Sequence, residues 1–359
     1  MTARLASARR TAVAPRGGAF AALSLDQLGA PVLRAALADA GLAPGDVDEV
    51  IVSNALGGGG NPARLVALAA GLPERVAGLS IDRQCAGGLD ALLLARQMVL
   101  AGDARVVVAG GVESYSRRPQ RLRTFADDSP PVPYDQPPFT PWPDRDPDMT
   151  EAAEALARHA MIDRAAQDAW AVHSHATAAT LPRAEIVPLA GLDRDPFTRA
   201  LSQRTAARAP VLTGSITAAN TAVAADAAAF CVVVAEDLAP QAPRILGGAS
   251  RGDTPMLPGL APIAATRAAL TACTLRITDI DIAEVMEAYA VQAIACVQGL
   301  GLDPAGVNRH GGALARGHPI GASGAINAVR LFHDLAPGQT GLATIAAAGG
   351  IATSLILRA

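Results

Sequence analysis

The chain has 359 residues, of which 50% are hydrophobic, 18% charged and 3% aromatic, and its formal net charge is -3. This length and composition are typical of a globular protein with about two or three domains. The near-neutral charge argues against a nucleic-acid-binding protein, and the scarcity of aromatic residues argues against base-stacking surfaces. No run of about eighteen apolar residues is present, so we expect no membrane span.

The first third of the chain predicts strands that alternate with helices. Apolar residues at helical spacing or in short buried runs mark each element. The expected elements are a helix over 25–40, a strand over 47–53, a helix over 64–71, an extended segment over 79–82, a helix over 89–100 and a strand over 105–109. This alternation predicts an α/β fold with a parallel sheet that is covered by helices on both faces.

The composition changes at Ser116, where a segment rich in proline, arginine and aspartate begins and continues to Asp148. One or two helices are expected over 150–179, followed by another irregular segment. We therefore predict an inserted loop domain over about 115–207 that lies against the core. A strand over 228–235 marks the return to the core.

The second half of the chain repeats features of the first. Segments 34–37, 47–50 and 105–111 are echoed in the same order by segments 267–270, 282–285 and 343–350. Two copies indicate a duplicated βα unit rather than a solenoid. We predict an N-terminal half over 1–237 and a C-terminal half over 238–359. Two such halves packed together bring their corresponding loops to one shared edge, where open α/β sheets place their chemistry.

Cys85 comes just before a strongly apolar helix and is followed by Gly87 and Gly88. A helix N-terminus stabilises a thiolate and lowers the pKa of the thiol, so Cys85 is a candidate nucleophile. Glycines behind it allow a substrate to come close. The simpler interpretation is a small buried hydrophobic residue, which describes most free cysteines.

His318 lies in the segment 317–324, which contains three glycines and one proline and precedes a helix expected over 325–335. Such a segment holds a rigid turn at a helix N-terminus. A histidine fixed there is a candidate base, because its pKa is near the working pH. The simpler interpretation is a turn histidine that bonds to backbone. Presented from comparable loops of the two halves, Cys85 and His318 form a nucleophile–base pair.

The remaining cysteines, Cys231, Cys273 and Cys296, are scattered and show neither metal-ligand spacing nor a disulfide framework. The six histidines do not cluster with them, so we predict no metal site. A reducing, cytoplasmic setting fits this cysteine usage. The N-terminal segment 1–16 lacks the continuous apolar core of a secretory signal, and we expect it to belong to the mature chain.

Five ordered segments give the chain a resemblance to the thiolase family, which condenses and cleaves acyl-CoA thioesters. They span nearly the whole chain: RQCAGGL at 83–89, GGVES at 110–114, GSITAAN at 214–220, EAYAVQ at 287–292, and the glycine-rich stretch 311–324. The resemblance implies a five-layered αβαβα sandwich of two similar halves, with a loop domain inserted in the first. It also implies an acyl-CoA substrate, no further cofactor, and a homodimer or homotetramer formed by sheet-edge pairing.

The resemblance further implies roles for particular residues. Cys85 is the position of the acylated nucleophile and His318 that of its base. One oxyanion hole uses the backbone N–H groups of Cys85 and Ala348, and Asn308 is the asparagine that orders the glycine-rich loop.

Several positions depart from the family pattern. The second cysteine, which moves the proton at the α-carbon, is replaced by Ala346. The asparagine of the family's Asn-Glu-Ala-Phe motif, which holds a water at the enolate oxygen, is replaced by Met286, and the motif ends in Ala288 and Tyr289. Both losses fall on the carbon–carbon step and not on acyl transfer to the nucleophile.

Further departures affect the substrate-binding positions. The loop-domain histidine that lies near the acyl chain corresponds to Asp148, followed by Met149, and a serine that contacts pantetheine corresponds to Ala222. The expected substrate-binding set is Asp148, Met149, Ala222, Ala288 and Tyr289.

Three interpretations follow. The first is an acyl-CoA C-acyltransferase that forms an acyl-enzyme on Cys85, with its Claisen or thiolysis step weakened or altered. The second keeps only the Cys–His pair, as an acyltransferase, a thioesterase-like enzyme or a decarboxylative condensing enzyme. The third is a non-catalytic subunit with this fold that binds acyl-CoA or a partner, against which the retained Cys85 and His318 argue.

Overall fold

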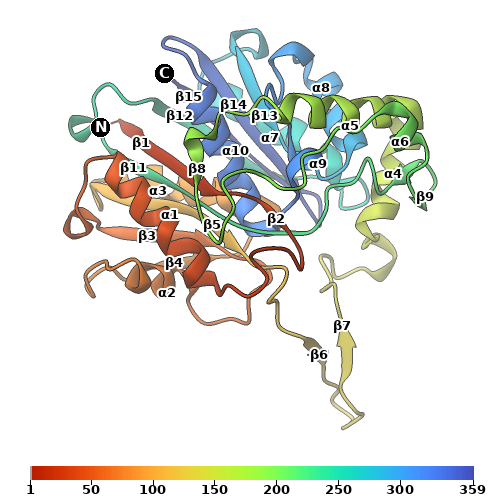
Figure 1. Ribbon diagram of the computed structural model, residues 1–359, viewed down its shortest axis with the longest axis horizontal. Helices are drawn as coiled ribbons and strands as arrows, with labels where there is room; N and C mark the ends of the chain where they lie inside the picture. The colour runs from red at the N-terminus through yellow and green to blue at the C-terminus, as the bar shows by residue number, and fades with distance from the viewer. Residues whose placement is uncertain (1) are drawn as a thin grey trace.

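A computed structural model describes residues 2–359 and confirms the mixed α/β fold expected from the sequence (Figure 1). The elements of the first part of the chain are β1 (Ala3–Thr11), β2 (Ala14–Pro15), α1 (Leu25–Asp39), β3 (Glu49–Ser53), α2 (Pro62–Ala69), β4 (Leu79–Ile81), α3 (Gly87–Ala101), β5 (Val106–Glu113) and, after the insertion, β11 (Ala225–Ala235). Helix α1 ends where the sequence predicts, because Gly41 takes the left-handed conformation with φ of 67°.

The second part of the chain contains β12 (Arg244–Gly252), α7 (Ala261–Ala272), β13 (Ile282–Val285), α8 (Ala290–Leu300), α9 (Ala313–Arg316), α10 (Ile320–Asp334), β14 (Thr340–Ala347) and β15 (Ile351–Arg358). The expectation that the helix after His318 begins at Ala325 is wrong. Helix α10 begins at Ile320, so Gly321 and Gly324 lie inside its first turns. The glycines therefore serve the packing of a helix rather than an irregular loop.

The insertion holds β6 (Arg121–Arg123), β7 (Val132–Tyr134), α4 (Met149–Ala160), α5 (Arg164–Ala178), β8 (Ile186–Val187), α6 (Gln203–Ala207), β9 (Val211–Thr213) and β10 (Ile216–Thr217). The helical stretch predicted over 150–179 is two helices, separated at Met161 by a left-handed residue with φ of 54°. The hairpin of β6 and β7 projects away from the body of the molecule, whereas α4 and α5 lie over the second half (Figure 1).

The prediction of a parallel sheet is wrong in part, because the sheet is mixed. Its strand order is β13-β14-β15-β12-β1-β11-β5-β3-β4. The pairs β3–β4, β3–β5 and β13–β14 are parallel, whereas β5–β11, β1–β11, β14–β15 and β12–β15 are antiparallel. The tight turn between β14 and β15 can join only antiparallel strands, and its Gly349 and Gly350 have φ of 77° and 76°.

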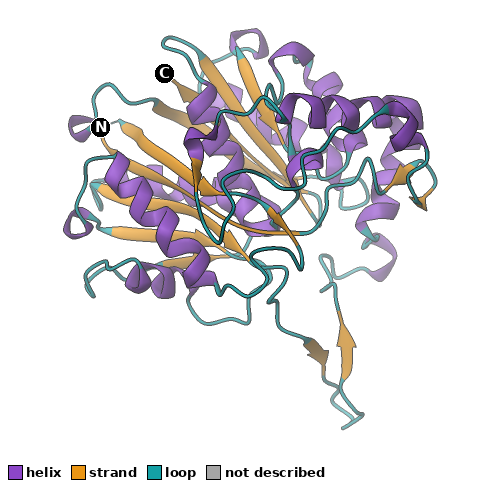
Figure 2. Cartoon of the chain, in the orientation of Figure 1, coloured by secondary structure: helices purple, strands orange, loops and turns teal. Residues whose placement is uncertain are grey.

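The sheet has two similar halves, which join where β1 pairs with β12 through Arg4 and Arg244. Helices α1 and α2 cover the outer face of the first half, and α7 and α8 cover the outer face of the second. Helices α3 and α10 lie between the halves and contact strands of both, as the cartoon in Figure 2 also indicates. This arrangement is the expected five-layered αβαβα sandwich.

The first turns of α3 and α10 pack backbone against backbone. A Cβ atom at Gly324 would lie 2.7 Å from the backbone nitrogen of Leu89, and one at Gly88 would overlap the backbone of Ala325. Real Cβ atoms do not approach backbone atoms so closely, so neither position accepts a side chain without a shift of a helix. The two helices are thereby fixed with their N-termini side by side.

This contact predicts the effect of Gly324→Ala. Alanine favours a helix interior by about 1 kcal/mol over glycine, but the clash with Leu89 should instead lower the free energy of unfolding by about 3 kcal/mol. Urea denaturation followed by circular dichroism measures the change. The matched control is Gly45→Ala, since a Cβ at Gly45 meets nothing within 4 Å. Equal stability of the two variants would contradict the proposed contact.

Candidate active site

The structure brings Cys85 and His318 together at the shared edge of the two halves. Cys85 lies in a one-turn helix that runs directly into α3, and His318 lies two residues before α10. The Sγ atom of Cys85 is 3.1 Å from Nε2 of His318. The close packing of α3 on α10 therefore sets the geometry of this pair, although 232 residues separate the two side chains in sequence (318 − 85 − 1).

A second hydrogen bond orients the imidazole of His318. Its Nδ1 atom is 2.7 Å from Oγ of Ser323, one turn further along α10. If Nδ1–H donates to Ser323, Nε2 is left as the acceptor for the proton of the Cys85 thiol. The backbone N–H of His318 donates to the carbonyl of Val223 at 2.7 Å, which fixes the main chain as well. The arrangement suits a base that takes the cysteine proton.

Burial dominates the electrostatics of the pair. It raises the pKa of Cys85 to about 12, and the carboxylates of Glu113 and Asp82 act in the same direction. It also lowers the pKa of His318 to about 4. The backbone N–H at the helix N-terminus does act to lower the pKa of Cys85, as expected, but burial outweighs it and the pKa is raised. At neutral pH the pair consists of a thiol and a neutral imidazole.

Glu113, at the end of β5, connects the cysteine and histidine sides of the site. Its carboxylate accepts hydrogen bonds from the backbone N–H groups of Ala55, Leu56 and Gly321 and from the amide of Asn54. Burial raises its pKa to about 7. The bond to Gly321 holds the first turn of α10, so Glu113 contributes to the position of His318. Glu113 belongs to the GGVES segment at 110–114, but nothing in the sequence alone indicates this role.

The turn after β14 presents the N–H of Ala348, which is the second predicted oxyanion donor. This N–H has no hydrogen-bond acceptor within the described chain. Gly349 and Gly350 adopt positive φ, but Ala348 does not, so its side chain causes no backbone strain. An alanine in place of glycine is therefore compatible with the turn.

The positions that depart from the family pattern carry apolar side chains. Met286 follows β13 and is only 2% exposed, and it belongs to the same apolar cluster against which Cys85, Ala222 and Ala288 pack. Ala346 lies on β14 opposite Ala352 and is partly exposed. None of the alanines or the methionine can transfer a proton.

The other cysteines do not replace the missing group. Cys231 is buried in β11, and Cys296 is buried in α8, where its thiol donates to the carbonyl of Gly259. Cys273 ends α7 on the outer layer of the second half. All four cysteines are unpaired. Across residues 2–359 no group of three histidine, cysteine, aspartate or glutamate side chains could hold a metal ion.

Asn308 orders the glycine-rich segment, and it does so together with a carboxylate that the sequence did not single out. Asn308 has φ of 47°, and its side chain bonds both backbone groups of Val285 and one oxygen of Glu287. Glu287 also accepts from Trp170, Ser174 and the N–H of Leu314. It therefore joins the loop domain to the second half. Its signal in the sequence is its place at the start of the EAYAVQ segment at 287–292 that carries the family resemblance.

The loop-domain residues reach the site through the start of α4. Asp148 is exposed, and its carboxylate caps this helix by accepting from the N–H groups of Thr150 and Glu151. Met149 is partly exposed beside it. The hydroxyl of Thr150 lies 3.2 Å from the phenolic oxygen of Tyr289. Tyr289 of the core, and not Asp148, thus makes the side-chain hydrogen bond between the core and the loop domain.

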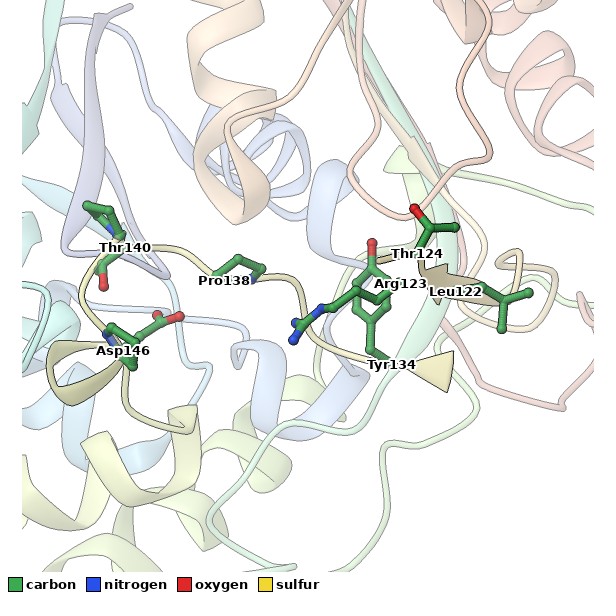
Figure 3. A pocket seen from close by; sticks show the side chains of 9 residues that line it. Leu122, Arg123, Thr124, Tyr134, Pro138, Thr140 and Asp146 are labelled. Carbon is green, nitrogen blue, oxygen red and sulfur yellow. The ribbon is translucent and has the colours of Figure 1, made fainter. Parts of the chain in front are cut away.

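A separate pocket lies in the insertion. It has a volume of about 750 Å³ between the β6–β7 hairpin and the segment 138–146, and Figure 3 shows Arg123 and Tyr134 on one side of it and Thr140 and Asp146 on the other. None of the predicted site residues lines it. The chemistry of Cys85 and His318 does not depend on this pocket. Within the described chain, no helix has the length and apolar character needed to cross a membrane.

Comparison with known proteins identifies the family. The model of the thiolase N-terminal domain matches residues 4–237, and that of the thiolase C-terminal domain matches residues 240–359. The chain is 37% identical to the acetyl-CoA acetyltransferase of Escherichia coli, with 98% of each chain covered.

Two solved structures have the same fold. The acetyl-CoA acetyltransferase of Bacillus anthracis is 32% identical with a TM-score of 0.91, covering 99% of this chain and 98% of that one. A thiolase of Ascaris suum in complex with coenzyme A is 29% identical with a TM-score of 0.92, and both chains are fully covered. Together with the match over both domains, these likenesses show that the chain belongs to the thiolase family.

Proposed function

We propose that this thiolase is an acyl-CoA C-acyltransferase that forms an acyl-enzyme on Cys85, with His318 as the base. The observation that carries the proposal is the 3.1 Å contact between Sγ and Nε2, with the imidazole oriented by Ser323. The names of the acetyl-CoA acetyltransferases and the coenzyme A complex of a relative support an acyl-CoA substrate. Coenzyme A enters as part of the substrate, and no further cofactor is invoked.

The first half-reaction needs only groups that are present. Nε2 of His318 takes the proton of the Cys85 thiol as the sulfur attacks the thioester carbonyl carbon. The N–H groups of Cys85 and Ala348 stabilise the oxyanion of the tetrahedral intermediate. The bond from this carbon to the coenzyme A sulfur then breaks, and the proton on His318 passes to the departing sulfur. The products are an S-acyl cysteine and free coenzyme A.

The second half-reaction is the one that this chain weakens. Carbon–carbon bond formation requires a base to remove a proton from the α-carbon of a second thioester and a donor to stabilise the enolate oxygen. The corresponding positions are Ala346 and Met286, which provide neither. The same observation favours a second candidate, a condensing enzyme whose carbanion arises when carbon dioxide leaves a carboxylated thioester, because that step needs no base.

The substrate-binding set remains a proposal. We assign to it Ala222, Ala288 and Tyr289 from the core, with Asp148 and Met149 from the start of α4; Ala222, Ala288 and Cys85 pack against the same apolar cluster. We also retain the division of the chain into halves at 1–237 and 238–359, with the loop domain inserted over about 115–207. Unpaired cysteines support a cytoplasmic, reducing location.

A homodimer or homotetramer is also proposed. Strand β4 lies at the end of the strand order, so one of its edges is free to pair, and Leu79 at its start is 44% exposed. Exposed apolar edge strands are ready templates for pairing with another chain. Because β4 leads directly to Cys85, such pairing would lie close to the site.

Acylation of the purified full chain tests the function. After mixing with acetyl-CoA and acid quenching, intact-mass and peptide analysis should find an acetyl group on Cys85. His318→Ala should slow this step by about 10²- to 10⁴-fold, because the general base is removed. Cys85→Ala should abolish it, and Cys273→Ala, on the outer layer, is the matched control that should not change it. Absence of the adduct in the unmodified protein would refute the proposal.

The pH dependence of acylation follows from the burial of His318. Its imidazole stays neutral, and can accept a proton, until the pH falls toward its lowered pKa of about 4. The acylation rate should therefore be constant between about pH 5.5 and 8 and fall only below about pH 5. Rapid-quench rates at constant ionic strength measure this profile. A midpoint near the ordinary histidine pKa of about 6.5 would contradict the burial argument.

The missing proton-transfer groups predict a gain of function. The double variant Ala346→Cys with Met286→Asn should raise cleavage of acetoacetyl-CoA by about 10²-fold or more, since it supplies a general acid–base and an enolate donor. Cys85 acylation should be unchanged in the same variant. The assay follows loss of the acetoacetyl-CoA absorbance, with each single variant as a control. If cleavage does not rise, the explanation of the weakened step is wrong.

A further inference from the structure

Tyr289 brings a hydroxyl to an otherwise apolar part of the site. Its ring packs against the apolar cluster formed by α4 and α8, including Leu156 and Ile294, while the residue stays partly exposed. Ala288 precedes it in the chain and accepts a hydrogen bond from the N–H of Ala222, and both alanines pack, like Cys85, against the apolar cluster that includes Met286. In such apolar surroundings a hydroxyl makes few hydrogen bonds to water. A ligand oxygen that bonds to it is therefore strongly preferred over an apolar ligand group at the same place.

A continuous set of backbone contacts places Tyr289 beside the Cys85–His318 pair. Thr221 forms an antiparallel bridge with Tyr289, and the N–H of Ala222 donates to the carbonyl of Ala288. Two residues later along the same segment, Val223 accepts from the N–H of His318. The segment 221–224 thus bonds both to the backbone at 288–289 and to the backbone of His318.

The hydroxyl pair has an unused proton. The oxygens of Tyr289 and Thr150 are 3.2 Å apart, and neither makes another hydrogen bond within residues 2–359. Two hydroxyls share one proton between them in such a bond, so the second proton is free for a third oxygen. Burial raises the pKa of Tyr289 to about 12, so the phenol stays protonated at any working pH.

Thr221 adds a second unsatisfied group at this place. Its Oγ1 atom is buried and has no hydrogen-bond partner in the described structure. Residues opposite each other in an antiparallel bridge direct their side chains to the same face, so this hydroxyl lies on the face of Tyr289. Buried hydroxyls are nearly always hydrogen-bonded in native proteins, so this hydroxyl is available to a water or a ligand oxygen at this place.

We propose that Tyr289 is a specificity-determining residue whose hydroxyl, oriented by Thr150, hydrogen-bonds an oxygen on the acyl chain carried by Cys85. The preferred acyl groups are then hydroxy- or oxo-substituted rather than plain alkyl groups. This inference rests on the proposed acyl-enzyme at Cys85 and specifies the class of thioester that forms it.

Two thioesters of nearly equal shape test the inference. The third carbon of the acyl chain carries a hydroxyl group in 3-hydroxybutyryl-CoA and a methyl group in its place in isovaleryl-CoA. The full chain is mixed with each, and the second-order rate of Cys85 acylation is measured by quenched intact-mass analysis. We expect the hydroxy compound to react about tenfold faster, the effect of one well-placed hydrogen bond.

Tyr289→Phe keeps the ring and removes only the hydroxyl, so the ratio of the two rates should fall to about one. The loss should come from the hydroxy compound alone, with the isovaleryl rate unchanged within about twofold. Thr150→Val should lower the ratio in the same direction, and it keeps the test decisive if Tyr289→Phe fails to fold. Tyr134→Phe makes the same chemical change in the β6–β7 hairpin and should leave the ratio unaltered.

The outcomes separate this inference from the function on which it rests. If Tyr289→Phe lowers both rates equally, or leaves a tenfold ratio intact, the tyrosine is structural and the inference is wrong. Equal reaction of both thioesters with the unmodified protein would also overturn it while leaving the acyl-enzyme in place. Failure of every thioester, acetyl-CoA included, to acylate Cys85 would overturn both.

Discussion

The backbone contact between α3 and α10 is the constraint on which the rest of the structure depends. At Gly88 and Gly324 the two helices approach too closely for any side chain. Because each helix comes from a different half of the chain, this contact aligns the halves, and because it lies at the helix N-termini, it brings Cys85 and His318 to the same point. The two side chains are thus held by a tightly packed part of the molecule, which suits the proposed catalytic pair, whose geometry must be fixed before substrate arrives.

That close packing also determines the charge state of the pair. Burial of Cys85 and His318 disfavours both charged forms, so the free enzyme holds a thiol beside a neutral imidazole. Glu113 contributes in two opposing ways. Its carboxylate holds the start of α10 through Gly321, yet it opposes a thiolate at Cys85. In the proposed mechanism, the proton therefore moves from Cys85 to His318 as the sulfur attacks the thioester. At that point the proposed oxyanion-hole N–H groups stabilise the negative charge that forms on the thioester oxygen.

The site is chemically uneven. The side that acylates Cys85 has a base, an orienting hydroxyl and an unpaired backbone N–H at Ala348. The positions that would handle the α-carbon are apolar: Met286 is buried in the apolar cluster and Ala346 lies on β14. Tyr289 supplies the hydroxyl that reaches across to the loop domain. Because of this contrast, we propose that Cys85 and His318 carry out acyl transfer and that Tyr289 selects the acyl group.

The sequence by itself determined the features that depend on residues close together in the chain. Helical periodicity located α1 and α3, the repeated segments showed two similar halves, and the glycines around Cys85 and His318 marked both as candidates. Tertiary structure decided what depends on residues far apart. It started α10 at Ile320, because the first turn packs on the backbone of α3, and it made the sheet mixed, because β11 enters only after the insertion. It also raised the pKa of Cys85 and joined Tyr289 to Thr150, since burial and side-chain partners come from segments that only the fold brings together.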